Sequence, residues 1–229
     1  MDLYSRKSKS IPQKVIIILL QLLLLLGAYW ILFRTGGSDL LGGIGLDIAP
    51  GYYLPRLSVF FFSIIVFVRM TFMICFLLKR AVPWEESISV PLAFALYYVG
   101  FALLVYGRRE PLDWIDMAAI ALFFVGSFLN TVSELQRHYW KQQAANKGKL
   151  YTEGLFSLSM HINYFGDFLW VTAYAILTRN PYAAIIPVFL FCFFAFYNIP
   201  KLDAYLADRY GEQFVKYRKN TSRFIPFIY

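Results

Sequence analysis

Residues 15–33 read VIIILLQLLLLLGAYWILF, an apolar run without a charged side chain. A helix needs about 20 such residues to cross the hydrocarbon core of a bilayer. Basic residues precede the run, as they do in a secretory signal sequence: Arg6, Lys7, Lys9 and Lys14. The run is too long for a signal sequence, and it lacks a clear small-residue cleavage site. We therefore predict an uncleaved first membrane-spanning helix.

Apolar runs of this kind recur along the chain. They cover residues 57–78, 88–106, 114–132, 155–177 and 182–197, and a glycine-rich loop is expected at 36–51. Of the 229 residues, 59% are hydrophobic and 16% are charged, whereas soluble domains carry about 25% charged residues. Disorder is excluded because it requires low hydrophobicity. The pattern predicts an all-α, polytopic membrane helix bundle of about six transmembrane helices in a single integral membrane domain, residues 1–229, ending in an amphipathic tail.

The basic residues predict an orientation. Most of the 22 lysines and arginines lie on the side of the N-terminus, which places both termini in the cytoplasm. The opposite side carries Arg34, Arg56, Arg108, Arg109 and Arg179. The net charge of +8 is thereby explained by topology and lipid contact, and no nucleic-acid partner is expected.

The metal-ligating residue types are scarce. The chain has two histidines and two cysteines, and it contains neither an HExxH nor a CxxC motif. Cys75 and Cys192 both lie in apolar runs, so we expect small buried side chains there, without a disulfide. No metal site is predicted.

Arg69 lies inside the second apolar run. It follows Leu57 by twelve residues, which is roughly 18 Å along a helix. A charge at that depth is costly, and it is a functional candidate by default. Two interpretations stay open, a structural ion pair within the bundle and a contact with substrate or cofactor.

A polar cluster opens the run at 155–177. Asn163 and Asp167 are four residues apart and share a helix face, with Tyr164 beside them. The face presents an amide, a phenol and a carboxylate, which together could bind a nucleotide. The alternative is a polar helix start that faces water. His161 alone is a weak signal.

Further polar residues follow the run at 114–132 and continue into the tail. Asn130 and Glu134 are four residues apart, as are Ser133 and Arg137, in what could also be a solvated helix end, and KGK at 147–149 is a basic turn suited to a phosphate. The tail has apolar residues at near-helical spacing. It is either a helix lying on the membrane surface or a lid over a cofactor. The apolar end at 223–229 is expected to insert between helices.

Several of these stretches resemble one family. GLFSLSMHINYFGD at 154–167 resembles the GLF…RHPNYFG(D/E) motif of membrane steroid 5-alpha-reductases and sterol reductases. YLADRYGEQFVKYR at 205–218, the terminus IPFIY, and ELQR at 134–137 followed by KGK are similar to the same superfamily. The resemblance covers about residues 130–229 and is nearest to the DUF1295 group. The same helical core occurs in isoprenylcysteine carboxyl methyltransferases and phospholipid methyltransferases, which use S-adenosylmethionine.

The resemblance implies an enzyme that binds NADPH with residues 130–229, while the spans of residues 1–129 form the substrate side. Asn163 and Asp167 would contact the nicotinamide-bearing end, and Tyr205 would line the cofactor site. The candidates for the phosphates are Arg137, Lys149 and Arg218. The remaining candidate cofactor-binding residues are His161, Glu134 and Tyr217.

Two departures from the motif bear on the alternative. Met160 stands where many members have arginine, and Ile162 where they have proline. The methyltransferases rely on that Arg-His-Pro start and carry an acidic cluster in the last helix, whereas residues 197–201 here read YNIPK. Both features favour the reductases.

We therefore expect hydride transfer from NADPH to a carbon–carbon double bond of a steroid, sterol, isoprenoid or enoyl lipid. The candidate proton donors are Tyr164 and, as an alternative, a tyrosine of the first half of the chain, and Arg69 is the candidate anchor of a polar substrate group. The alternatives are an S-adenosylmethionine-dependent methyltransferase and a lipid-binding protein without catalysis. The expected partners are the bilayer and a lipophilic substrate, and a bacterial inner membrane is favoured over the endoplasmic reticulum.

Overall fold

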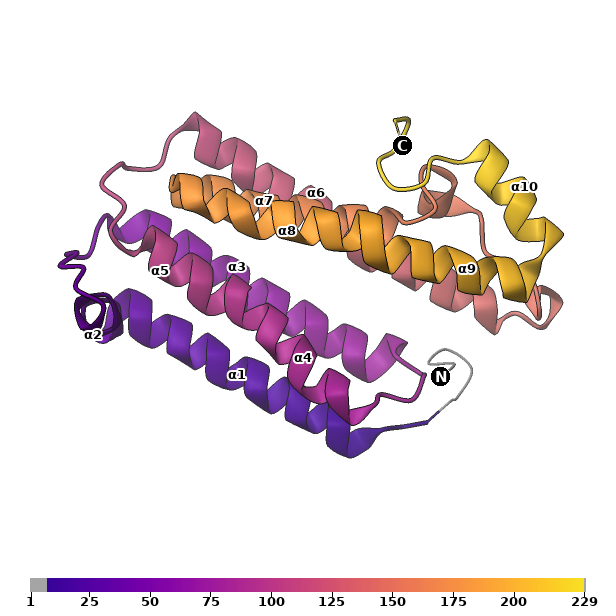
Figure 1. Cartoon of the computed structure of the whole chain (residues 1–229), viewed down its shortest axis with the longest axis horizontal. Helices are drawn as coiled ribbons and strands as arrows, with labels where there is room; N and C mark the ends of the chain where they lie inside the picture. Colours follow the sequence, from indigo (N-terminus) through magenta and orange to yellow (C-terminus); the bar gives the residue numbers. More distant parts are fainter. Residues whose placement is uncertain (1–7, 229) are drawn as a thin grey trace. The chain divides into compact units, whose positions relative to one another are not determined.

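The computed structural model describes residues 8–228, so the predicted flanking residues Arg6 and Lys7 and the terminal Tyr229 lie outside the described residues. The described chain is helical (Figure 1). Its α-helices are α1 (Ile11–Phe33), α2 (Gly36–Gly43), α3 (Tyr53–Phe72), α4 (Trp84–Ala95), α5 (Phe101–Tyr106), α6 (Trp114–Gln142), α7 (Ile162–Thr178), α8 (Ile185–Phe193), α9 (Ile199–Tyr210) and α10 (Glu212–Asn220).

Within the described residues 8–228, five helical segments are long and apolar enough to span a membrane. They are Ile11–Phe33, Tyr53–Leu77, Trp84–Tyr106, Trp114–Gln142 and Pro181–Tyr210. The all-helical class is confirmed, and the chain has the character of an integral, multi-pass membrane protein. The predicted fifth span, residues 155–177, is shorter than the other spans. Its helix α7 has 17 residues, or about 25 Å, because a 3₁₀ turn at Gly154–Ser157 and the bends after it precede Ile162.

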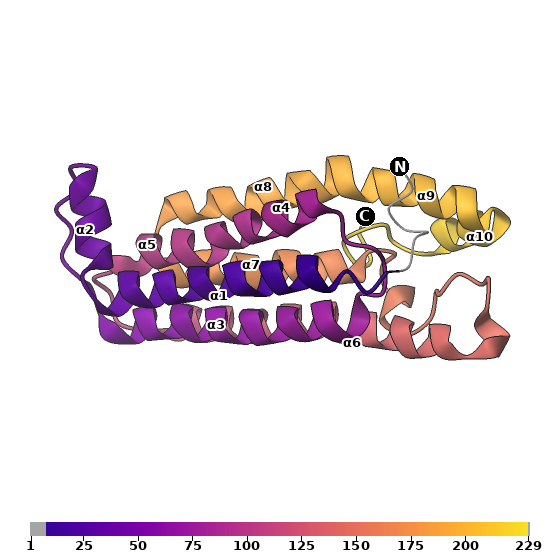
Figure 2. The ribbon, with the colours of Figure 1, turned by 90° about the horizontal axis from the view of Figure 1, so that it is seen from below.

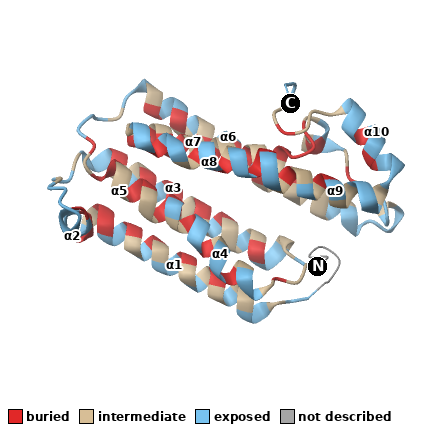
Figure 3. Cartoon of the chain, in the orientation of Figure 1, coloured by how far each residue is buried: buried red, intermediate tan, exposed pale blue. Residues whose placement is uncertain are grey.

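The outer faces of these segments are apolar. Only 33–39% of each spanning window is buried within the protein, and large side chains such as Leu23, Val68, Phe128 and Phe189 are exposed. Figure 3 shows exposed stretches along the labelled helices. Contiguous apolar surface of this kind is covered by lipid in a membrane protein. Cys75 and Cys192 are also exposed, so the expectation that they are buried was wrong. The predicted orientation of the termini stays a prediction.

Three of the spans contain a π-helical turn. The turns are Met73–Leu77 at the end of α3, Leu96–Gly100 between α4 and α5, and Phe194–Asn198 between α8 and α9. The last of these turns joins α8 to α9, so the helix continues past the predicted end at residue 197 and into the segment expected to be the tail. Such turns are rare and occur often at functional sites.

The chain divides into two compact units. The first unit contains residues 1–119 and 174–184, and the second contains 120–173 and 185–229. In the first unit α1 packs against α3 and against α4 and α5 (Figures 1 and 2). Its core centres on the Tyr174 ring, which stacks on Phe101 at 5.0 Å and meets Phe62 edge-on at 5.2 Å.

The glycine-rich segment at 36–51 is partly helical, contrary to the loop expected there. Gly36 and Gly37 begin α2 and are buried. A Cβ atom on Gly36 would lie 2.4 Å from the Trp30 ring, and one on Gly37 would lie 2.2 Å from the Tyr106 ring. These glycines therefore serve close packing against aromatic rings, a tertiary effect that outweighs the low helix propensity of glycine.

In the second unit α6 and α7 approach each other through glycines. A Cβ on Gly126 would lie 2.6 Å from the Gly166 carbonyl oxygen and from the Trp170 nitrogen. A Cβ on Gly166 would lie 2.6 Å from the Asn130 nitrogen. The missing side chains bring the two backbones into direct contact, as small residues do in membrane helix pairs.

We expect Gly126→Ala to destabilise the protein by about 1–3 kcal/mol, because the added methyl group meets backbone atoms that cannot rotate away. The measurement is the thermal unfolding of the detergent-purified protein. Gly27→Ala on α1 is the control, since no atom lies within 4 Å of that position. Equal melting temperatures for the two variants would contradict the close contact.

The C-terminal segment returns to the second unit. Gly211, at a φ of 50°, separates α9 from α10, and α10 buries Phe214 and Tyr217 against Met160. Phe224 is fully buried beside the rings of Phe165, Phe191 and Phe194. The predicted insertion of the apolar end is confirmed for Phe224, whereas Phe227 and Ile228 are exposed.

Candidate functional site

Three of the candidate residues meet where α6 and α7 lie together. The Asn163 side-chain amide donates a 2.9 Å hydrogen bond to one carboxylate oxygen of Glu134, and Arg137 pairs with the other oxygen. Asn130 donates to the Asn163 carbonyl oxygen at 3.1 Å. Positions 130, 134 and 137 share one face of α6, because they are four and three residues apart. We call Asn130, Glu134, Arg137 and Asn163 the polar cluster.

The polar cluster is not a solvated helix end, because α6 continues to Gln142, ten residues beyond the end predicted at Val132. The Glu134 side chain is 13% exposed and that of Arg137 is 39% exposed. The guanidinium lies 5.5 Å from the centre of the Phe156 ring and within electrostatic range of the Tyr164 and Tyr210 hydroxyl groups. A partly exposed cation thus stands beside a largely covered carboxylate, an arrangement in which the cation can still reach an anionic ligand.

Tyr164 is held by stacking. Its ring lies parallel to the His161 ring at 5.8 Å and to the Phe194 ring at 4.6 Å. Phe194 is the first residue of the π-helical turn that joins α8 to α9. The ring of the predicted proton donor is therefore fixed between two neighbours, and its catalytic role stays a prediction.

His161 belongs to a second, buried group of residues. Its Nε2 lies 2.8 Å from one carboxylate oxygen of Asp203 on α9, and Arg223 donates to the other oxygen at 2.8 Å. His161 and Asp203 are 1% and 5% exposed. We call His161, Asp203 and Arg223 the tail clasp. The sequence analysis assigned no role to Asp203 or Arg223, although Asp203 stands four residues after the buried Ile199 and so lies on the inner face of α9.

Two further hydrogen bonds support the tail clasp. The Ser159 hydroxyl donates to the Phe224 carbonyl oxygen at 2.8 Å, and the Met160 backbone nitrogen donates to the Ser222 carbonyl oxygen at 2.8 Å. Residues 159–161 therefore hold the C-terminal segment against the start of α7. Met160, one of the departures from the family motif, takes part through its backbone, which any residue other than proline could do.

The other predicted cofactor contacts are dispersed over the second unit. Tyr217 is buried and donates its hydroxyl proton to the Phe156 carbonyl oxygen, and burial raises the pKa of the Tyr217 phenol above its usual value. Tyr205 accepts a hydrogen bond from Arg209, and Asp167 accepts one from Trp170. Lys149 and Arg218 are exposed to solvent. The structure thus gathers Glu134, Arg137 and Asn163 directly, and their role as cofactor contacts stays a prediction.

Arg69 lies in the other compact unit. Arg69 is on α3 and is 8% exposed. Its guanidinium lies close enough to the hydroxyl groups of Tyr98 and Tyr174 to interact with them electrostatically. Its surroundings in that unit are aromatic and polar, as expected for a charge inside a helix bundle. The predicted contact with substrate stays a separate prediction.

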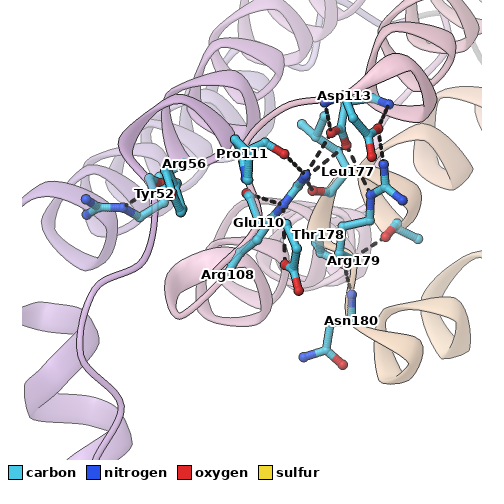
Figure 4. Close-up of polar contacts among 12 residues, drawn as sticks. Tyr52, Arg56, Arg108, Glu110, Pro111, Asp113, Leu177, Thr178, Arg179 and Asn180 are labelled. Atoms are coloured by element: carbon cyan, nitrogen blue, oxygen red, sulfur yellow. Dashed lines mark hydrogen bonds and ion pairs between the residues drawn. The ribbon is translucent and has the colours of Figure 1, made fainter.

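An ion-pair network around the buried pair of Arg108 and Asp116 in the first unit was not predicted from the sequence, where its arginines counted as flanking basic residues (Figure 4). Arg108 binds both carboxylate oxygens of Asp116 at 2.9 and 2.7 Å, and it donates to the Leu177 carbonyl oxygen at 2.6 Å. Arg179 bonds to Asp113 and lies 3.4 Å from Asp116. We call Arg108, Asp113, Asp116 and Arg179 the arginine network.

The arginine network joins segments that are distant in sequence. Asp113 accepts a hydrogen bond from the Ile115 nitrogen and so caps the start of α6. Arg108 also donates to the carbonyl oxygens of Glu110 and Pro111. The guanidinium groups of Arg108 and Arg179 are both bonded to partners within the protein, so we interpret the arginine network as structural. The candidate ligand site is therefore the polar cluster.

Comparisons with known proteins agree with the resemblance in the sequence. A family model described as "Protein of unknown function (DUF1295)" matches residues 63–221. The match includes the polar cluster, Tyr164 and most of the tail clasp, and it ends before Arg223.

The curated relatives include two enzyme classes. The chain is 28% identical over 121 residues to protein-S-isoprenylcysteine O-methyltransferase B of Arabidopsis thaliana, covering 50% of this chain and 61% of the relative. It is 24% identical over 165 residues to the Delta(14)-sterol reductase of Methylotuvimicrobium alcaliphilum, covering 64% and 37%. It is 36% identical over 89 residues to the probable O-methyltransferase ustE of Ustilaginoidea virens, covering 38% and 31%. The chain thus spans less than two thirds of each relative.

Proposed function

The chain belongs to the DUF1295 family, and from this premise we propose that it is a membrane-embedded enzyme that uses NADPH to reduce a carbon–carbon double bond of a lipid-like substrate. The observation that carries the proposal is the position of Arg137 in the polar cluster. There a partly exposed guanidinium stands next to the Asn163 amide, within a region rich in exposed basic side chains.

The charge of this region favours a polyanionic cofactor. The loop after α6 carries the exposed Lys147 and Lys149, and α10 carries exposed basic residues, among them Arg218. The two elements are neighbours, because the Leu150 nitrogen donates to the Gln213 side chain at 3.0 Å. NADPH bears three phosphate groups, whereas S-adenosylmethionine carries a sulfonium cation. A basic surface attracts the former and repels the positive charge of the latter.

The residues fit the parts of NADPH as follows. The Asn163 amide, fixed by Glu134, would hydrogen-bond the carboxamide of the nicotinamide, and Asp167 would bind the adjoining ribose. Arg137, Lys149 and Arg218 would bind phosphates. Tyr205 would line the site, while His161 and Tyr217 would hold the elements that form it. When bound, NADPH supplies a hydride for the substrate double bond.

The chain would supply the proton and the surroundings of the reaction. Tyr164 would donate a proton to the carbon that does not receive the hydride, which completes the reduction of the double bond to a single bond. Apolar helices exclude water from the reacting atoms. Residues 1–129 would admit the substrate from the bilayer. A relative that is named a sterol reductase supports a substrate of the steroid, sterol or isoprenoid type.

We expect Asn163→Ala to weaken NADPH binding by about 10- to 100-fold, because a hydrogen bond within a charged network contributes roughly 1.5–3 kcal/mol. The measurement is the dissociation constant of NADPH, from intrinsic fluorescence quenching of the detergent-purified protein. Asn220→Ala, an exposed change on α10, should leave the constant unaltered. A folded Asn163→Ala variant with wild-type affinity would disprove the assignment of the site.

The tail clasp favours a second candidate function, methyl transfer from S-adenosylmethionine to a lipid carboxylate or amine. The absence of an acidic cluster at residues 197–201 is one of the sequence features that disfavour this function. In the structure α9 nevertheless provides one buried carboxylate, Asp203, to the histidine of the motif. Five of the matched relatives are named methyltransferases. Ligand selectivity separates the two candidates.

A further inference from the structure

A groove of about 630 Å³ lies in the first unit, between the start of α1 and the end of α3. The lining residues are Ser8, Lys9, Ile11, Lys14, Val15, Ile18, Cys75, Phe76, Leu78 and Lys79. Beneath them lies a small buried core of Ile17, Ile74 and Val82. The volume is in the range of sites for small organic ligands.

The basic side chains of the groove lie near one end of it, and apolar side chains line the rest. Its three lysines stand at the ends of the helices, and Lys14 donates to the Leu78 carbonyl oxygen, which fixes its ammonium group at the end of α3. Val15 and Ile18 lie further along α1, with Ile18 about 10 Å beyond Ile11. A ligand that fills the groove would therefore place an anion at one end and an apolar chain along the rest.

Two backbone features add positive charge and shape at the charged end. Among residues 8–228, no side chain caps the N-terminus of α1, and the partial positive charge of the helix dipole lies at this end of the groove. The end of α3 widens into the π-helical turn Met73–Leu77, which brings Cys75 and Phe76 to the wall. Both features are built into the backbone and do not depend on the position of flexible lysine side chains.

We propose that this groove binds one anionic phospholipid, with its phosphate at Lys9, Lys14 and Lys79 and an acyl chain along Val15, Ile18 and Cys75. Basic sites between membrane helices attract anionic headgroups, and each lysine near the surface contributes to that attraction. The apolar wall selects a lipid over a free phosphate, since an inorganic ion would leave the wall uncovered. The site is independent of the proposed reductase activity.

The two cysteines allow a test with an internal control. Both are exposed, but Cys75 lines the groove and Cys192 lies on α8 outside it. We expect dioleoylphosphatidylglycerol, added to the detergent-purified protein, to slow alkylation of Cys75 by N-ethylmaleimide about tenfold at ten times its dissociation constant. The rate at Cys192 should not change, and dioleoylphosphatidylcholine should protect neither residue. The rates are measured by peptide mass spectrometry.

Charge variants locate the headgroup. The double variant Lys9→Gln/Lys79→Gln should weaken the protection by phosphatidylglycerol roughly 30-fold, from two lost lysine contacts. The matched control Lys216→Gln/Lys219→Gln removes two exposed lysines of α10 and should keep full protection. Equal protection in both double variants would overturn the proposal.

A bulky residue tests the apolar wall. Val15→Trp places a ring in the groove and should abolish protection of Cys75 by the lipid. Leu19→Trp, at another exposed position of α1 outside the groove, should not. Displacement of the lipid by glycerol 3-phosphate at equal concentration would show that the site binds a free phosphate, and it would overturn the proposal of a lipid site.

Discussion

Replacing Asp116 with alanine should lower the free energy of unfolding by about 3–5 kcal/mol, the largest effect that we expect from a single substitution in this chain. Asp116 is fully buried, and it holds both Nη atoms of Arg108, whose side chain is 1% exposed. Removing the carboxylate leaves the guanidinium buried without its counter-charge. Carbonyl oxygens of Pro111 and Leu177 would remain as neutral partners, which cannot replace a negative charge.

The measurement is the stability of the detergent-purified variant, by thermal and denaturant unfolding. Glu110→Ala is the matched control on the same arginine. The Glu110 carboxylate lies 3.9 Å from Arg108 Nε and its side chain is 66% exposed, so its loss should have an effect below about 1 kcal/mol. If Asp116→Ala were no more destabilising than Glu110→Ala, the arginine network would not have the structural role assigned here.

The second large effect is expected at the tail clasp. Asp203→Ala should lower the free energy of unfolding by about 2–4 kcal/mol, because it removes the carboxylate that holds both His161 and Arg223. The value is set below that for Asp116 because the Arg223 side chain is 25% exposed and water can replace its partner. The bonds of Ser159 and Met160 to residues 222–224 should then open more often.

Limited trypsin digestion measures that opening directly. Cleavage after Arg223 should become faster in Asp203→Ala than in the wild-type protein, because a protease acts on the opened segment. Asp208→Ala, an exposed change on the same helix, is the control and should leave the cleavage rate unchanged. If both variants were cleaved at the wild-type rate, the tail clasp would not be what holds the C-terminal segment.

The fold class followed from the sequence because long apolar runs have one stable form in a bilayer, a helix with all backbone groups bonded. The boundaries were less predictable. Hydropathy detects only the apolar part of a helix, so it placed the end of α6 at Val132. The helix continues to Gln142, because good helix formers such as Glu134 and Gln136 follow the apolar run. Hydropathy also placed the start of α7 at residue 155, seven residues before its observed start at Ile162, because the residues of the 3₁₀ turn at Gly154–Ser157 are themselves largely apolar.

The candidate site was predictable where a helical repeat fixed it. A spacing of four residues placed Asn130 and Glu134 on one face of a helix. In the structure both residues bond to Asn163, and Arg137 pairs with Glu134. Contacts between distant segments carried no such signal. Asp203 and His161 are 42 residues apart, and Arg108 and Leu177 are 69 residues apart, so neither pair could be derived from periodicity.

The most direct test of the proposed function is the ligand selectivity of the wild-type protein. The detergent-purified chain is titrated in parallel with NADPH, NADH and S-adenosylmethionine while its melting temperature is followed. A ligand at one hundred times its dissociation constant stabilises the folded state by about 2.7 kcal/mol. The account predicts a rise with NADPH, a smaller rise with NADH, which lacks the third phosphate, and none with S-adenosylmethionine. A rise with S-adenosylmethionine alone would contradict it and assign the polar cluster to a methyl donor.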